Sequence, residues 1–205
     1  MLSPYIQGVH APDPLLVFDR TALRLRRARA ARKWSGRAFL KQEIANRLVE
    51  RLDDVRRRFD TALDIGCHID EIAMALGTRA SVGRLIRADL GFSFARGAAG
   101  PAVVADEEAL PFASASFDLV LSAMTLHWVN DLPGTLIQIS RCLRPDGLFL
   151  GAMLGGGTLW QLRQALGAAE SEVEGGLSPR ISPFADLGDA AGLLQRAGFA
   201  LPVAD

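Results

Sequence analysis

The stretch ALDIGCHID at residues 62–70 decides the predicted fold, because an apolar run there ends in an acid and a glycine and a helical stretch follows. A strand that leads into a tight turn and a helix presents backbone N–H groups to a ligand. Four more apolar runs, with helical stretches between them, follow at residues 84–89, 102–106, 117–122 and 147–152. Alternating strands and helices predict an α/β fold, a mostly parallel sheet with helices on both faces and ligands at the carboxyl ends of the strands.

The other segments are assigned around this core. Residues 1–17 are predicted to be irregular, and residues 18–205 to form one domain that begins with a basic helix at 18–40 and a second helix at 41–52. After the fifth strand, which the turn at 143–146 introduces, Thr158 and Gln161 have the spacing of a capping box. A last helix is predicted to end at Gly198, and residues 199–203 to begin a sixth strand.

Composition limits the functional classes. The 205 residues are 49% hydrophobic and 22% charged with a formal net charge of +0, which favours a globular protein over a nucleic-acid or membrane-surface binder. Two cysteines indicate no disulfide framework, and no apolar run is long enough for a membrane span. No secretory signal is recognised, and a cytoplasmic location is expected. The Arg-rich, acid-poor segment from Arg20 to Arg37 leaves a mitochondrial transit peptide as an alternative.

Acidic residues stand at three successive strand ends. Asp64 is placed to hold an ammonium group, and Asp89 stands where a carboxylate accepts ribose hydroxyls. Asp106 and Glu107 are placed to reach the exocyclic amine of an adenine. The alternative is that these acids cap the helices that follow them. Leu90, beside Asp89, is added to the candidate cofactor contacts.

The first loop departs from a glycine-rich fingerprint, which would place glycine at positions 66, 68 and 70. Only Gly66 is present, and His68 and Asp70 are predicted to put side chains where a nucleotide-like ligand lies. Cys67 is interpreted as a small loop residue that contributes to the cofactor site, because no partner base is evident for a nucleophile.

The segment after the fourth strand, residues 122–131, is expected to face a bound substrate. His127 offers an imidazole for proton transfer and Trp128 a large aromatic wall, although both are also compatible with simple packing. Ser122 begins this segment and is assigned to the cofactor site. His68, Asp70 and His127 include the ligand types of a two-histidine, one-carboxylate iron site, but that spacing is common and no metal is predicted. The basic segment from Arg20 is interpreted first as a solvated face and second as a docking surface for an acidic partner.

Several motifs together resemble one family. They are FDR at 18–20, LDIGC at 63–67, ADEEALPF at 105–112, LHWVNDLP at 126–133, LRPDG at 143–147 and GGLSPRISPF at 175–184. The chain resembles bacterial members of the family of the mitochondrial complex I assembly factor 5, which is related to the malonyl-carrier-protein methyltransferases of biotin synthesis. The resemblance implies a Rossmann-like class I methyltransferase fold that binds S-adenosylmethionine (SAM) through Asp64, Gly66, Asp89, Asp106 and Glu107.

The resemblance also sets the functional alternatives. The leading hypothesis is SAM-dependent methyl transfer to an unidentified acceptor, such as a carrier-protein thioester or a protein side chain. The mitochondrial branch implies arginine hydroxylation on a respiratory complex I subunit instead. A third hypothesis is a cofactor-impaired scaffold that binds a partner. The family pattern continues through a sixth and seventh strand, so the chain is expected to be C-terminally truncated, with an open sheet edge that an oligomer or partner covers.

Overall fold

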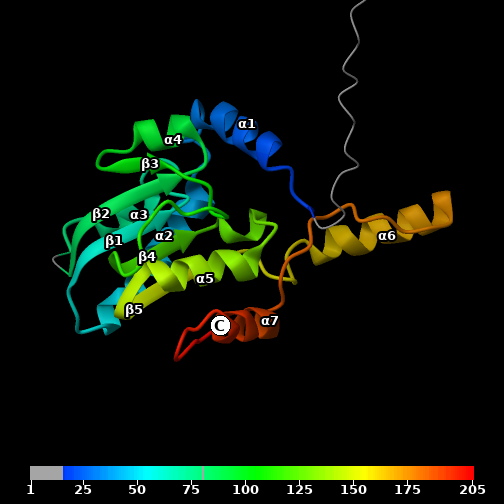
Figure 1. Ribbon diagram of the computed structural model, residues 1–205. Helices are drawn as coiled ribbons and strands as arrows, with labels where there is room; N and C mark the ends of the chain where they lie inside the picture. Colours follow the sequence, from blue (N-terminus) through cyan, green and yellow to red (C-terminus); the bar gives the residue numbers. More distant parts are fainter. Residues whose placement is uncertain (1–15, 80) are drawn as a thin grey trace, which may run out of the picture.

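A five-stranded parallel sheet forms the centre of the molecule in the computed structural model, which describes residues 16–79 and 81–205. The strand order is β3-β2-β1-β4-β5 (Figure 1). The strands are β1 (Phe59–Ile65), β2 (Val82–Asp89), β3 (Ala102–Val104), β4 (Phe117–Ala123) and β5 (Leu143–Ala152). All four strand pairings are parallel, so the predicted α/β class and the mostly parallel sheet are confirmed.

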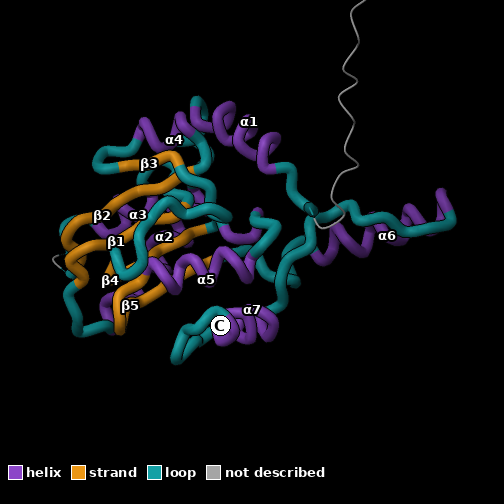
Figure 2. The backbone as a smooth tube through the Cα atoms, in the orientation of Figure 1, coloured by secondary structure: helices purple, strands orange, loops and turns teal. Residues whose placement is uncertain are grey.

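Helices cover both faces of the sheet. One face packs against α2 (Phe39–Glu50), the 3-10 turn η1 (Arg51–Asp54) and α3 (Glu71–Leu76). The other packs against η2 (Leu126–Trp128), α5 (Leu132–Cys142) and α7 (Leu187–Arg196). Helices α1 (Arg20–Ala31) and α4 (Phe92–Gly97) lie at the β3 side, whereas α6 (Trp160–Glu174) extends away from the sheet (Figures 1 and 2).

The alternation of β1 explains how the two faces are filled. Leu63 and Ile65 belong to the core cluster on the α5 side, whereas Ala62 belongs to the cluster on the α2 side. Because successive side chains of a strand point to opposite faces, Asp64 shares the face of Ala62 and lies on the α2 side. The buried carboxylate therefore faces the helix that supplies a lysine, Lys41.

The basic N-terminal segment differs from the prediction. The helix predicted at 18–40 ends at Ala31, and a turn separates it from α2, which begins at Phe39 rather than at residue 41. Ser35 and Gly36 have low helix propensity, and within the turn the ring of Trp34 stacks on His68. This tertiary contact and the weak local propensity together end the helix early.

Three predictions near the C-terminus need correction. The segment at 143–146 is not a separate turn, because β5 already begins at Leu143 and contains a register shift around Asp146, whose φ is 61°. Helix α6 has Leu159 as its N-cap without a side-chain cap bond, so the capping box at Thr158 is wrong. The last helix ends before Gly198, whose φ is 91°, as predicted. Residues 199–203 form no strand, although β5 is an edge of the sheet formed by the described residues.

Strands β3 and β5 are the two edges of the sheet formed by the described residues. The prediction that a partner covers an edge stays a prediction. Across residues 16–79 and 81–205, every helix is too short or too polar to span a membrane.

Candidate functional site

The first loop connects β1 to α3 through three residues with positive φ. These angles are 74° at Gly66, 47° at His68 and 61° at Asp70. The backbone N–H groups of Gly66 and Cys67 donate to the carbonyl of Ala88, at 2.7 and 3.1 Å, which holds the loop against the end of β2. Non-glycine residues with positive φ cost roughly 1 kcal/mol each, so His68 and Asp70 occupy positions where glycine would relieve backbone strain.

Gly66 is required by packing as well as by its φ. A Cβ atom at this position would lie 2.0 Å from Oγ1 of Thr125, on the loop after β4. The loops after β1 and β4 therefore touch directly, and the side chain of Thr125 is fully buried. The contact with Thr125 therefore requires a glycine at position 66 whether or not a ligand approaches the loop.

Asp64 lies at the centre of the site with 1% of its surface exposed. Within the described part of the chain neither of its carboxylate oxygens has a hydrogen-bond partner. Burial raises the pKa of Asp64 to about 7, although the nearby Lys41 acts in the opposite direction. A buried acceptor without a partner is costly and indicates a missing donor, such as the ammonium group expected from the sequence.

Lys41 of α2 supplies the positive charge beneath the first loop. Its ammonium group donates to the carbonyl of Gly66 and lies 2.7 Å from Nδ1 of His68. Burial lowers the pKa of Lys41, while the charges of Asp64 and Glu71 counteract that effect. The buried lysine thus partly balances the carboxylates of Asp64 and Glu71.

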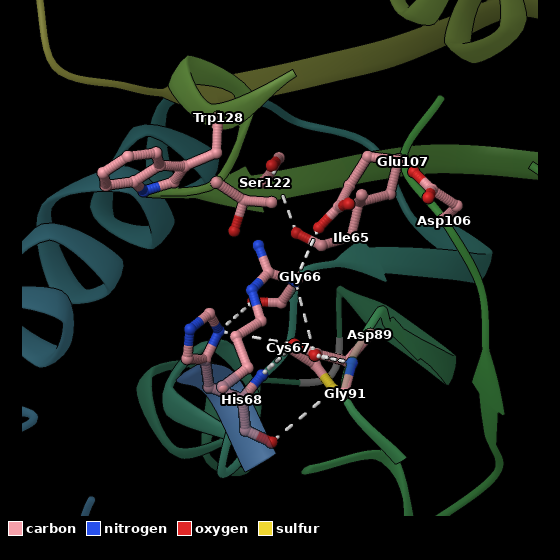
Figure 3. Close-up of polar contacts among 12 residues, drawn as sticks. Ile65, Gly66, Cys67, His68, Asp89, Gly91, Asp106, Glu107, Ser122 and Trp128 are labelled. Carbon is pink, nitrogen blue, oxygen red and sulfur yellow. Dashed lines mark hydrogen bonds and ion pairs between the residues drawn. The ribbon is translucent and has the colours of Figure 1, made fainter. Parts of the chain in front are cut away.

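Asp89 is held at the end of β2 by backbone donors. The N–H of Gly91 donates to its Oδ1 at 2.7 Å and the N–H of His68 to its Oδ2 at 3.1 Å (Figure 3). The side chain is 1% exposed and its orientation is fixed by both bonds. A carboxylate positioned in this way has acceptor capacity left for ligand hydroxyl groups.

Helix α1 covers the acids at the strand ends, which corrects the interpretation of the basic segment as a solvated face. The guanidinium of Arg20 contacts both Asp106 and Glu107. That of Arg27 lies 2.7 Å from Oε1 of Glu107 and 3.4 Å from Oδ1 of Asp89. The other arginines of α1, at positions 24, 26 and 29, are exposed. An unpaired buried carboxylate is costly, and the guanidinium groups of Arg20 and Arg27 offset this cost for Asp89, Asp106 and Glu107.

His68 and Asp70 have different environments. The His68 ring lies between Trp34 and Phe94, with ring centroids 4.6 Å away in each case, and burial lowers its pKa well below the usual value. Asp70 instead accepts from Nε of Arg87 at 2.5 Å and from the N–H of Ala99 at 2.6 Å. The prediction that the Asp70 side chain lies in the ligand position is wrong, because the Arg87 charge on β2 holds it elsewhere.

The iron-site alternative finds no support in this geometry. Asp70 is engaged by Arg87, and the His68 ring contacts Lys41. Over the described ranges, 16–79 and 81–205, no group of three or more His, Cys, Asp and Glu side chains has the arrangement of a metal site.

His127 and Trp128 lie on η2, immediately after β4. The His127 ring packs 5.2 Å from Trp128 and 6.0 Å from Phe184, measured between ring centroids. Burial lowers its pKa to about 4, and the Arg27 and Lys41 charges act in the same direction. Among the described residues its Nδ1 atom has no hydrogen-bond partner. His127 is therefore a neutral imidazole at neutral pH, and the same burial and charges make it a weak base.

A cavity of about 310 Å³ lies beside His127 and is lined by residues from four segments. Its walls include Phe18 before α1, Asn130 after η2 and Phe184 before α7. Asn130 joins two of these segments, because it accepts from the N–H of Phe18 at 2.7 Å and donates to its carbonyl at 3.0 Å. The cavity is a candidate acceptor site next to the imidazole.

The remaining predicted contacts are structural in this geometry. Ser122 is fully buried and donates to the carbonyl of Ile65 at 3.1 Å, which ties β4 to β1 (Figure 3). Leu90 is fully buried, and so is Cys67, whose thiol pKa is raised by burial. Both cysteines are free and buried. No nucleophilic role for Cys67 is indicated, as the sequence suggested.

Sequence reasoning missed four residues of the site: Arg20, Arg27, Trp34 and Lys41. The signal was present as a basic run without acids that precedes a domain with acids at three strand ends. Complementary charge in separate segments points to pairing between them, but the sequence alone does not show which arginines pair.

Comparisons with known proteins show the family to which the chain belongs. Residues 63–151 match a family model described as a methyltransferase domain. The malonyl-[acyl-carrier protein] O-methyltransferase of Methylovorus sp. is 34% identical over 203 residues, which cover 92% of this chain and 67% of that protein. The chain belongs to this methyltransferase family. The family resemblance inferred from the motifs is thus confirmed.

Within the methyltransferase family the chain is more similar to another relative. The human mitochondrial arginine hydroxylase NDUFAF5 is 44% identical over 200 residues, which cover 94% of this chain. The chain spans only 58% of the length of that protein. The activities of the full-length relatives therefore apply to this chain only as proposals.

Solved structures support the methyltransferase fold. A methyltransferase of Haloferax volcanii, solved with its activator Trm112, aligns with a TM-score of 0.63 at 18% identity and covers 89% of this chain and 77% of its own. A SAM-dependent methyltransferase of Thermotoga maritima aligns with a TM-score of 0.60 at 18% identity, covering 83% and 78%. At such identities the likeness concerns the fold alone.

Proposed function

We propose that this chain binds SAM at the carboxyl ends of β1, β2 and β3 and transfers its methyl group to an acceptor. The observation that supports the proposal most strongly is the pair of buried carboxylates on adjacent strands. Asp64 has two oxygens without partners among the described residues, and Asp89 is oriented by two backbone N–H groups. An ammonium group and a hydroxylated ribose are the complementary ligand groups.

The residues fit the cofactor by their chemistry. Asp89 would accept the ribose hydroxyls and Asp64 the ammonium group, while Asp106 and Glu107 would lie near the adenine amine. When bound, SAM supplies a methyl group attached to a positively charged sulfur. The protein would then contribute mainly by positioning, since an oriented pair of reactants needs little further assistance.

His127 is proposed as the base or orienting group on the acceptor side. Its imidazole is neutral and borders the cavity beside Trp128 and Phe184. Such a group takes a proton from an acceptor nucleophile or orients it. The acceptor itself is proposed only as a small molecule or a protein side chain, and a cytoplasmic location stays a prediction.

Titration calorimetry with SAM tests the cofactor site. Asp89→Ala is expected to weaken binding at least tenfold, because a charge-assisted bond contributes about 1.5–3 kcal/mol. Asp118→Ala is the matched control, since Asp118 accepts from the N–H of Thr61 at the opposite end of the sheet. Equal affinity of wild type and Asp89→Ala would refute the ribose assignment. If wild type does not bind SAM, the cofactor-impaired scaffold becomes the leading hypothesis.

The identity to the human arginine hydroxylase supports a second candidate function, hydroxylation of an arginine on a complex I subunit. Mass spectrometry of an arginine-containing acceptor peptide separates the two activities. Methyl transfer adds the mass of one methylene and requires SAM, whereas hydroxylation adds that of one oxygen atom and requires dioxygen.

A further inference from the structure

We infer that Arg27 of α1 determines the affinity of the nucleoside site, because a bound ribose has to displace its guanidinium from Asp89. The inference rests on the proposed function, namely that Asp89 binds ribose hydroxyls. It adds a role to a residue outside the strand-end loops, on a helix that contacts α4 at the edge of the sheet.

The contacts of Arg27 place its charge inside the site. Its Nη1 atom lies 2.7 Å from Oε1 of Glu107 and 3.4 Å from Oδ1 of Asp89. Arg27 is 5% exposed, and Asp89 and Glu107 are each 1% exposed. Such a pair is poorly screened by solvent, so its formation and release have a measurable effect on ligand binding.

Ligand and arginine compete because Asp89 has few free acceptor positions. Backbone N–H groups of Gly91 and His68 already use one position on each carboxylate oxygen, and Nδ1 of the neutral His68 ring lies 3.4 Å from Oδ2. The guanidinium of Arg27 takes the second acceptor position on Oδ1, beside the N–H of Gly91. Two ribose hydroxyls need a position on each oxygen, and a neutral hydroxyl is a weaker donor than a guanidinium. Binding therefore includes the free energy of separating Arg27 from Asp89.

The geometry of α1 explains why the other arginine on the same face, Arg20, cannot take over the contact of Arg27 with Asp89. Arg20 and Arg27 are seven residues apart and lie on one face of α1. Arg20 anchors the start of the helix on Asp106, Glu107 and the carbonyl of Trp128. A Cβ atom added at Gly91 would lie 3.3 Å from Cβ of Arg27. The stem of Arg27 thus packs on the turn that presents Asp89.

The experiment compares Arg27→Met with Arg29→Met, which removes an exposed arginine from the same helix. The probe is S-adenosylhomocysteine, measured by titration calorimetry with the full chain. Arg27→Met is expected to bind about tenfold more tightly than wild type, because the ribose no longer has to displace a guanidinium from Asp89. Arg29→Met is expected to match wild type. Unchanged or weaker binding by Arg27→Met would overturn the inference.

Hydrogen exchange on the wild-type chain gives a second test that needs no variant. Addition of S-adenosylhomocysteine is expected to accelerate amide exchange in the second half of α1, because Arg27 leaves Asp89. Slower or unchanged exchange in a chain that binds the probe would overturn the inference alone. If wild type, Arg27→Met and His68→Gly all fail to bind, the proposed function fails, and the inference fails with it.

Discussion

The indole of Trp34, in the turn between α1 and α2, lies 4.6 Å from the imidazole of His68, and His68 in turn lies 4.6 Å from the ring of Phe94. The three rings connect the N-terminal segment, the first loop and α4. Trp34 also donates through its indole N–H to Glu71 at the start of α3. The turn that ends α1 is therefore held in place by the first loop and the start of α3.

Trp34→Ala is expected to lower the free energy of unfolding by about 1–3 kcal/mol, because it removes the ring stack and the bond to Glu71. Urea unfolding followed by circular dichroism measures this change. Trp160→Ala, at an exposed position on α6, is the control and should change stability by less than about 0.5 kcal/mol. Similar losses for the two variants would contradict a specific role for Trp34.

Gly66→Ala is expected to destabilise the fold by at least about 2 kcal/mol. The added Cβ atom would overlap the side chain of Thr125, and the alanine would have to adopt the positive φ of this position. The control is Gly97→Ala, where an added Cβ meets nothing within 4 Å. Gly97→Ala should leave stability unchanged or raise it by up to about 1 kcal/mol. Thermal unfolding of both variants measures the difference, and tolerance of alanine at position 66 would contradict the described loop contact.

The pKa of Asp64 predicts how stability depends on pH. Its folded-state pKa of about 7 lies above the ordinary carboxyl value of 3.8. The protonated form is therefore stabilising below about pH 4, and this contribution is lost as pH rises through about 7. Asp64→Asn cannot ionise, so its stability relative to wild type should increase between about pH 4 and about 7. Parallel stability profiles in urea unfolding would contradict a raised Asp64 pKa.

Protonation of Asp64 is expected to weaken the proposed cofactor binding, whereas it stabilises the fold. An ammonium group prefers ionised Asp64, so SAM affinity should rise as pH increases through about 7. Calorimetry at pH 6 and pH 8, repeated in buffers of different ionisation enthalpy, would also count the proton released. Affinity that is independent of pH would place the ammonium group elsewhere.

His127 predicts a different pH limit for catalysis at saturating cofactor. Because its pKa is lowered to about 4, the imidazole stays neutral well below pH 6, and kcat should fall only as pH approaches about 4. His127→Gln should lower kcat by a factor of about 10², the low end for a general base, because a pKa of about 4 makes the imidazole a weak one, while SAM affinity stays near that of wild type. A kcat that falls already near pH 6.5, or that is unchanged in His127→Gln, would contradict the role as a base.

Two conspicuous motifs acquire a structural explanation from the fold. In the segment LHWVNDLP, Asn130 bonds to Phe18 and Asp131 caps α5 through the N–H of Gly134. In the segment GGLSPRISPF, Ser178 and Arg180 donate to Glu170 of α6, which lowers the pKa of that carboxyl to about 2. Asn130, Pro183 and Phe184 of these two motifs also line the cavity beside His127, so the motifs act partly through the fold.

The sequence by itself determined the fold class, the five strand positions and the strand ends at which acids gather. These features depend on local periodicity and on the rule that parallel strands present their carboxyl ends at one edge. Only the tertiary structure decided what those acids contact. Asp70 pairs with Arg87, and Asp89, Asp106 and Glu107 pair with arginines of α1 that precede them by 62 to 87 residues. Pairing between distant charges depends on which side chains burial brings together, and that free energy is absent from any local sequence pattern.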